Sequence, residues 1–169
     1  ILVDDASPDG SQNLITNLIE KRGDHKVRAV FHPENQGRGA AFMSGFKESK
    51  GRIVGFIDID FEVSPVYLFE CISKIRNEGA DLVLGKRHYK LNHDSLFRHI
   101  LSSGYARLAS LLLSIPYGLD SETGYKFFRR EALAKYAGLF QHTGWFWDTE
   151  VVCRFIENGH KIQTIPCLF

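Results

Sequence analysis

The stretch Ile53-Val54-Gly55-Phe56-Ile57-Asp58-Ile59-Asp60 places two carboxylates directly after a strongly apolar run. A run of this length is typical of a buried strand, which we predict over residues 52–57. Side chains two residues apart in a strand point to the same side, so Asp58 and Asp60 are expected to face one cation. Carboxylate oxygens suit Mg²⁺ or Mn²⁺, which bind phosphates and keep positions open for them. The alternative is a pair of solvated acids, because Asp-x-Asp alone is a weak motif.

Strand-like and helix-like runs alternate on both sides of this stretch. The alternation predicts the α/β class, with a parallel sheet that carries helices on its faces. In the second half a long helix comes first, and the alternation is less regular. The predicted strands cover residues 1–4, 27–32, 52–57, 81–85, 124–129 and 161–168, and the predicted helices cover 11–22, 39–50, a segment opened by Ser64-Pro65, about 94–115, and 145–158.

Polar residues follow the ends of the first four predicted strands. In an open α/β sheet, ligands bind at the carboxyl ends of the strands. Asp4 and Asp5 follow the first strand, Arg38 the second, the Asp58–Asp60 pair the third and Arg87 the fourth. We therefore expect acids and bases to converge on one edge, as a ligand made of phosphate and metal requires.

The composition is that of an ordinary globular domain. The chain has 169 residues, 44% of them hydrophobic, which suits one domain. Lys and Arg total 21 against 20 for Asp and Glu, so no charge excess points to a nucleic-acid partner. Three widely spaced cysteines fit reduced, buried thiols in the cytoplasm. The chain opens and closes within apolar runs, without an initiator Met or signal peptide, so we expect it to be truncated at both ends.

The most apolar long stretch, residues 96–115, has two interpretations. Its apolar residues recur at helical spacing, while Arg98 and Arg107 argue against a transmembrane span. The helix is then either an amphipathic core helix, which periodicity alone favours, or one that lies on a membrane surface.

Several motifs occur in register along the chain: Val3-Asp4-Asp5-Ala6-Ser7-Pro8-Asp9-Gly10, Asn35-Gln36-Gly37-Arg38-Gly39-Ala40-Ala41, Asp58-Ile59-Asp60, Gly85-Lys86-Arg87, the run 120–130 and the run 145–150. In this order and spacing they resemble the motifs of family-2 glycosyltransferases. Gly37-Arg38-Gly39 lacks the third glycine of a dinucleotide fingerprint, and no phosphate-binding P-loop is present. The second half is similar to the branch that includes dolichyl-phosphate mannose and glucose synthases and bacterial polyprenyl-phosphate glycosyltransferases.

The resemblance implies a GT-A fold, with a Rossmann-like, mostly parallel central sheet flanked by helices and a mixed C-terminal part. It implies one catalytic domain over residues 1–169, with a nucleotide-sugar half (1–90) and an acceptor half (91–169). This sequence departs from the family pattern at Glu62, where the family usually has Gln, and at Lys86, where the family usually has Ser. Carried over by position, the resemblance implies that Asp4, Asp5 and Arg38 bind the nucleotide, and that Asp60 with Asp58 holds the metal and donor. It implies that Arg87 binds a phosphate and that Asp120 is the catalytic base. Arg98, Asp148 and Glu150 are implied to lie on the acceptor side.

The function that follows is an inverting transfer of a sugar from a UDP- or GDP-linked donor, with Mg²⁺ or Mn²⁺ stabilising the leaving diphosphate. A polyprenyl or dolichyl phosphate is the expected acceptor, which places the enzyme at the cytoplasmic face of a membrane. A phosphate acceptor is already ionised, so Asp120 would mainly orient groups; it also fits a turn cap beside Ser121. The alternatives are a family-2 enzyme that extends a glycan on a hydroxyl acceptor, and a non-catalytic sugar-nucleotide-binding module. Trp145 and Trp147 fit stacking on a sugar, a membrane interface or core packing.

Overall fold

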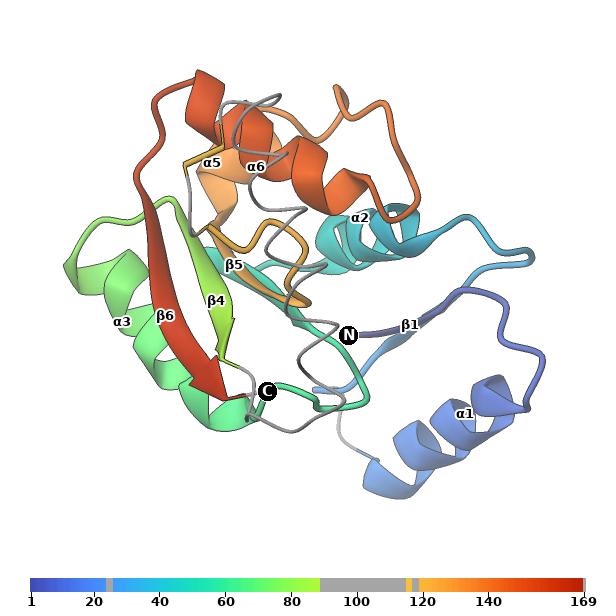
Figure 1. Cartoon of the computed structure of the whole chain (residues 1–169). Helices are drawn as coiled ribbons and strands as arrows, with labels where there is room; N and C mark the ends of the chain where they lie inside the picture. The colour runs from blue at the N-terminus through green and yellow to red at the C-terminus, as the bar shows by residue number, and fades with distance from the viewer. Residues whose placement is uncertain (24–25, 89–114, 117–118, 169) are drawn as a thin grey trace, which may run out of the picture. The chain divides into compact units, whose positions relative to one another are not determined.

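The chain divides into two compact units, residues 1–51 with 139–147 and residues 52–138 with 148–169. The computed structural model describes residues 1–23, 26–88, 115–116 and 119–168 (Figure 1). We call the two parts the first and the second unit. The expected division into a nucleotide-sugar half (1–90) and an acceptor half (91–169) stays a prediction. The packing units do not reveal which part of the chain binds which substrate.

The first unit is built on two parallel strands, each followed by a helix. Strand β1 (Leu2–Asp4) pairs with β2 (Ala29–Phe31), and Val3 lies opposite Val30. Helix α1 (Ser11–Arg22) has the predicted bounds, ending at Gly23 in the left-handed conformation, and α2 (Arg38–Glu48) follows β2. The apolar positions of α1 do not form a buried face, since no residue of α1 is buried.

The second unit contains a four-stranded mixed sheet in the order β3-β5-β4-β6. Strands β4 and β6 are parallel, whereas β5 runs antiparallel to both of its neighbours, β3 and β4. The mixed part expected in the C-terminal half is thus the insertion of β5 between β3 and β4. The strands are β3 (Ile53–Ile57), β4 (Leu82–His88), β5 (Tyr125–Arg129) and β6 (Ile162–Leu168).

Helices accompany this sheet along the chain. Ser64 caps a 3-10 turn, η1 (Pro65–Tyr67), by accepting a hydrogen bond from the Val66 amide at 3.4 Å, and α3 (Leu68–Asn77) continues from it. A short helix that the sequence did not predict, α5 (Arg130–Ala134), follows β5. Helix α6 (Trp147–Glu157) precedes β6.

Alternate residues of the central strands are buried in two different layers. Tyr125 and Phe127 of β5 belong to the apolar cluster that contains Cys71 and Ile75 of α3. The neighbouring Phe128 packs instead on Phe155 of α6, with ring centroids 5.7 Å apart. Because successive strand residues point to opposite faces, helices cover both faces of this sheet. All three cysteines are free, as expected, and Cys71 and Cys167 are buried.

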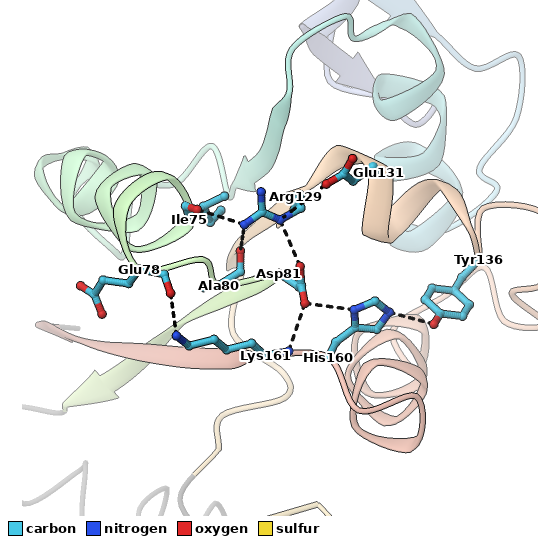
Figure 2. A network of polar contacts seen from close by, with 9 residues as sticks. All are labelled: Ile75, Glu78, Ala80, Asp81, Arg129, Glu131, Tyr136, His160 and Lys161. Carbon is cyan, nitrogen blue, oxygen red and sulfur yellow. Dashed lines mark hydrogen bonds and ion pairs between the residues drawn. The ribbon is translucent and has the colours of Figure 1, made fainter.

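A polar network joins the strand ends opposite the candidate site (Figure 2). Asp81 accepts hydrogen bonds from Arg129 Nε, from the Lys161 amide and from His160 Nδ1, each at 3.1 Å. Tyr136 contacts His160 Nε2 at 2.9 Å. Burial raises the pKa of Asp81, but these hydrogen bonds together outweigh it and hold the pKa below its ordinary value. The network ties together the starts of β4 and β6 and the end of β5.

Candidate functional site

The two acids of the Asp-x-Asp motif lie in a turn that follows β3. The strand ends at Ile57, and the Phe61 amide donates to the Asp58 carbonyl at 3.2 Å. The Glu62 amide donates to Asp60 Oδ1 at 3.2 Å. The argument from strand alternation is therefore wrong for this pair, because neither acid lies within the strand. A tight turn holds them, with Asp58 half-buried and Asp60 exposed.

Asp58 and Asp60 are candidates for part of a metal's ligand set. Within the part of the chain that the structure describes, no three His, Cys, Asp or Glu side chains form a group able to hold a metal ion. Mg²⁺ and Mn²⁺ are commonly held by one or two carboxylates, with the remaining positions filled by water and by phosphate oxygens of the substrate. Asp58 and Asp60 fit a cation that binds together with a diphosphate, and their role as metal ligands stays a prediction.

Arg87 and Asp120 form a bidentate ion pair. Arg87 Nε and Nη2 donate to the two carboxylate oxygens of Asp120 at 2.7 and 2.9 Å, and the side chains are 20% and 18% exposed. The Arg87 amide adds a longer hydrogen bond of 3.4 Å. This pairing gives Asp120 a role other than a turn cap, since it fixes the carboxylate beside a guanidinium that suits phosphate.

The acids and this pair lie at the same edge of the second unit's sheet. Ile57, the last residue of β3, is opposite Tyr125, the first of β5, and the Asp58 amide donates to the Gly124 carbonyl at 3.3 Å. Arg87 lies near the carboxyl end of β4, which is at that same edge because β4 is also antiparallel to β5. Of the convergence predicted from the sequence, the part that involves Asp58, Asp60 and Arg87 is therefore present within the second unit, and Asp120 lies with them. Asp4, Asp5 and Arg38 belong to the first unit, so their share of it stays a prediction.

Both acids expected on the acceptor side have partners within the protein. Asp148 is 1% exposed and pairs with the ammonium group of Lys126, which is itself fully buried and also donates to the Thr123 carbonyl. Glu150 accepts from Arg154 Nη2 at 2.8 Å, one helical turn away. The Asp148 side chain is too deeply buried for direct contact with an acceptor. Through its ion pair with Lys126 it would act by holding β5 against α6.

In the first unit, Asp5 anchors the loop that leads into α2. Its carboxylate accepts from the Gln36 amide at 2.9 Å and the Gly37 amide at 2.7 Å, and it lies 2.6 Å from His32 Nδ1. Burial raises the pKa of Asp5, but the hydrogen bonds from Gln36, His32 and Gly37 lower it further than burial raises it. Asp4 is also buried, and hydrogen bonding from Ser7 lowers its pKa. Both acids thus order the edge at which a nucleotide is expected.

Arg38 lies at the start of α2 beneath an exposed aromatic ring. Its guanidinium carbon is 5.1 Å from the ring centroid of Trp145, which is 78% exposed, whereas Trp147 is fully buried. A Cβ at Gly39 would come within 2.5 Å of the Trp147 side chain, so glycine is required by close packing. Trp147 is therefore a core residue, and Trp145 remains available for stacking.

Some residues of the site were missed or lie outside the description. Arg98 and nearly all of the helix predicted over 94–115 fall within residues 89–114, which are outside the described part, so their expected roles are untested. His32 was expected to be a surface or packing residue and instead contacts Asp5, and Lys126 was not identified from the sequence. The one available signal was a lone lysine within the apolar run Tyr125-Lys126-Phe127-Phe128.

Comparison with known proteins gives a consistent family. The family model described as glycosyl transferase family 2 matches residues 1–137. The chain is 27% identical to a dolichyl-phosphate beta-glucosyltransferase of Saccharomyces cerevisiae, over 98% of this chain and 55% of that protein. It is 25% identical to the glycosyltransferase AglD of Haloferax volcanii, over 98% of this chain and 26% of that protein.

A solved structure has the same GT-A fold. It is glucosyl-3-phosphoglycerate synthase from Mycobacterium tuberculosis in complex with Mn²⁺ and UDP-glucose, with a TM-score of 0.70, 20% identity, and coverage of 99% of this chain and 57% of that one. The chain thus spans about half or less of the length of these relatives. Among residues 1–23, 26–88, 115–116 and 119–168, no helix has the length and apolarity needed to span a membrane.

Proposed function

Because this chain belongs to glycosyl transferase family 2, we propose that it carries the catalytic core of an inverting, metal-dependent glycosyltransferase. The donor is a UDP- or GDP-linked sugar, and the acceptor is a polyprenyl or dolichyl phosphate. The observation that carries this proposal is the gathering of Asp58, Asp60, Arg87 and Asp120 at one edge of the second unit's sheet. Acids for a cation and a guanidinium for a phosphate are the groups that transfer from a nucleoside diphosphate needs.

In the proposed reaction, an acceptor phosphate oxygen forms a bond to the anomeric carbon of the sugar. The bond from that carbon to the diphosphate breaks, and the nucleoside diphosphate leaves with the electron pair. A divalent cation held by Asp58 and Asp60 supplies charge stabilisation to this leaving group when it is bound. Attack from the opposite face in one displacement inverts the configuration.

The Arg87–Asp120 pair favours a phosphate acceptor over a hydroxyl acceptor. A phosphate monoester is largely ionised at neutral pH, with a second pKa of about 6, and needs no base. Asp120 is fixed on both oxygens by Arg87. In this proposal it keeps the guanidinium in place beside the phosphate, and proton removal is not its main task.

The curated relatives support the acceptor class, since one is named as a dolichyl-phosphate glucosyltransferase. The solved structure supports the metal, since it holds Mn²⁺ with UDP-glucose. A lipid acceptor requires the site to reach a membrane surface, which we propose is the cytoplasmic face.

The test is transfer of labelled sugar from UDP-glucose or GDP-mannose to polyprenyl phosphate by the full-length protein with Mn²⁺ or Mg²⁺. We expect a glycosylated lipid with one of the two donors and loss of product in Asp60→Asn. Glu131→Gln is the matched control, because Glu131 is an exposed acid at the opposite end of β5. No product with either donor, in protein that binds nucleotide and metal, would favour the non-catalytic binding module.

A further inference from the structure

Four large apolar side chains in and shortly after the Asp58–Asp60 turn are exposed. We define an apolar rim as Ile59, Phe61, Val66 and Phe69, which are 74%, 58%, 65% and 77% exposed. Ile59 and Phe61 belong to the turn itself, while Val66 and Phe69 are three residues apart on η1 and α3. Residues at that spacing face the same side of a helix. Single exposed apolar residues are ordinary, but four within eleven positions mark a contact surface.

The backbone of the turn exposes one of these side chains at a cost. Phe61 has a φ of 54°, in the left-handed region that a bulky residue rarely adopts. A glycine or asparagine would adopt this conformation with less strain. Strain of this kind persists only where the surroundings impose it, and it gathers at functional sites. The outward placement of this ring is thus a feature of the turn.

The rim lies at the candidate site's edge of the sheet. The hydroxyl of Tyr67, between Val66 and Phe69, accepts a hydrogen bond of 3.1 Å from the amide of Leu168 near the carboxyl end of β6. The parallel strands β4 and β6 therefore both end on the side where η1 and α3 begin, as Figure 1 shows. Arg87, near the end of β4, lies at that same edge.

The size and charge of the rim restrict its occupant. The exposed apolar area is roughly 550 Å², if each side chain contributes its exposed share of a large residue, which falls short of the roughly 800 Å² per partner of a stable dimer. Glu62 and Glu70 are exposed acids next to it, so the rim gains no electrostatic attraction from the anionic lipids of the bulk membrane. A neutral amphiphilic surface fits both restrictions.

We propose that the apolar rim inserts into the headgroup–hydrocarbon boundary of a bilayer and brings the Asp58–Asp60 turn to the phosphate of a membrane-embedded acceptor. This inference rests on the proposed function for the identity of the acceptor, but the membrane contact stands on the rim alone. Shallow insertion of apolar side chains is how interfacial segments bind neutral membranes. Because the contact is apolar, high salt should not weaken it.

The test places a fluorescent label at Phe69 by Phe69→Cys in a Cys153→Ser background of the full-length protein, since Cys71 and Cys167 are buried. Arg76→Cys, at the exposed far end of the same helix, is the matched control. The probe is phosphatidylcholine vesicles containing nitroxide lipids. We expect strong quenching at position 69, little at position 76, and no change in 0.5 M salt.

A second measurement uses Phe69→Ser, which should raise the apparent KM for long-chain polyprenyl phosphate in vesicles about tenfold, as partial burial of one aromatic side chain implies. The KM for a short, water-soluble isoprenyl phosphate should not change. Equal quenching at both labels, no quenching in vesicle-bound protein, or a dimer that protects position 69 would each overturn the rim proposal. If quenching occurs as expected but UDP and GDP fail to bind, the proposed function fails while the membrane contact stands.

Discussion

Replacement of Lys126 by methionine should destabilise the protein severely. Lys126 is fully buried and is bonded to Asp148, which is 1% exposed. Lys126→Met keeps the length of the side chain but removes the ammonium group that pairs with the buried Asp148 carboxylate. Breaking a buried pair in this way costs about 3–5 kcal/mol. The loss is a large fraction of the roughly 5–15 kcal/mol that stabilises a typical domain.

The assay is urea unfolding followed by circular dichroism. With a slope of about 2 kcal/mol per molar urea, the midpoint of Lys126→Met should fall by about 2 M. Lys135→Met removes an exposed lysine and should shift stability by no more than about 0.5 kcal/mol. The double variant Lys126→Met/Asp148→Leu should recover most of the loss, because an apolar pair of similar volume is often as stable as a buried ion pair. A loss below about 1 kcal/mol in the single variant, or additive losses in the double variant, would refute the reasoning.

Three further predictions follow from the described contacts. Asp120→Asn should lower transfer to polyprenyl phosphate about tenfold by loosening Arg87, and a loss above about a thousandfold in that assay would indicate that Asp120 acts as a base. The folded-state pKa of Asp81 lies below its unfolded value, so its contribution to stability is present above the ordinary carboxyl pKa and is lost as the pH falls through the folded value. Urea midpoints of Asp81→Asn should therefore depend less on pH between about 5 and 2 than those of the parent, and equal slopes would contradict this. Gly39→Ala should destabilise by about 1–3 kcal/mol in thermal unfolding, because the methyl group would collide with Trp147; an unchanged midpoint would show that Trp147 moves freely.

Local patterns in the sequence predicted the elements well where short-range chemistry determines them. Helix α1 has the predicted bounds because Gly23 ends it in the left-handed conformation. Ser64 caps the helical segment formed by η1 and α3 as expected, although the first turn of that segment is a 3-10 turn. The pairing of strands is different, because hydrophobic periodicity does not specify neighbours. The position of β5 between β3 and β4 depends on the pairing of residues 68 to 76 positions apart with β3 and 42 to 46 positions apart with β4.

The site shows the same division between local and distant information. The ends of the predicted strands pointed to Asp58, Asp60 and Arg87 at one edge, because the carboxyl ends of parallel strands share an edge, whereas Asp120 was identified only through the family resemblance. The two ion pairs were not predictable, because their members lie far apart in the sequence. Arg87 and Asp120 are 33 residues apart, and Lys126 and Asp148 are 22 residues apart. The strand argument for Asp58 and Asp60 was wrong because the strand ends at Ile57, three residues before Asp60, so strand alternation does not apply to the pair.

The central claim is that this site binds a nucleoside diphosphate through a divalent cation. The most direct measurement is calorimetric titration of UDP and of GDP into the full-length protein, with Mn²⁺ and with chelator, for the parent and for Asp60→Ala. We predict binding of one of the two nucleotides that requires the metal and disappears in the variant. Folded protein that binds neither nucleotide under any metal condition, or that binds one equally well with chelator, would contradict the account.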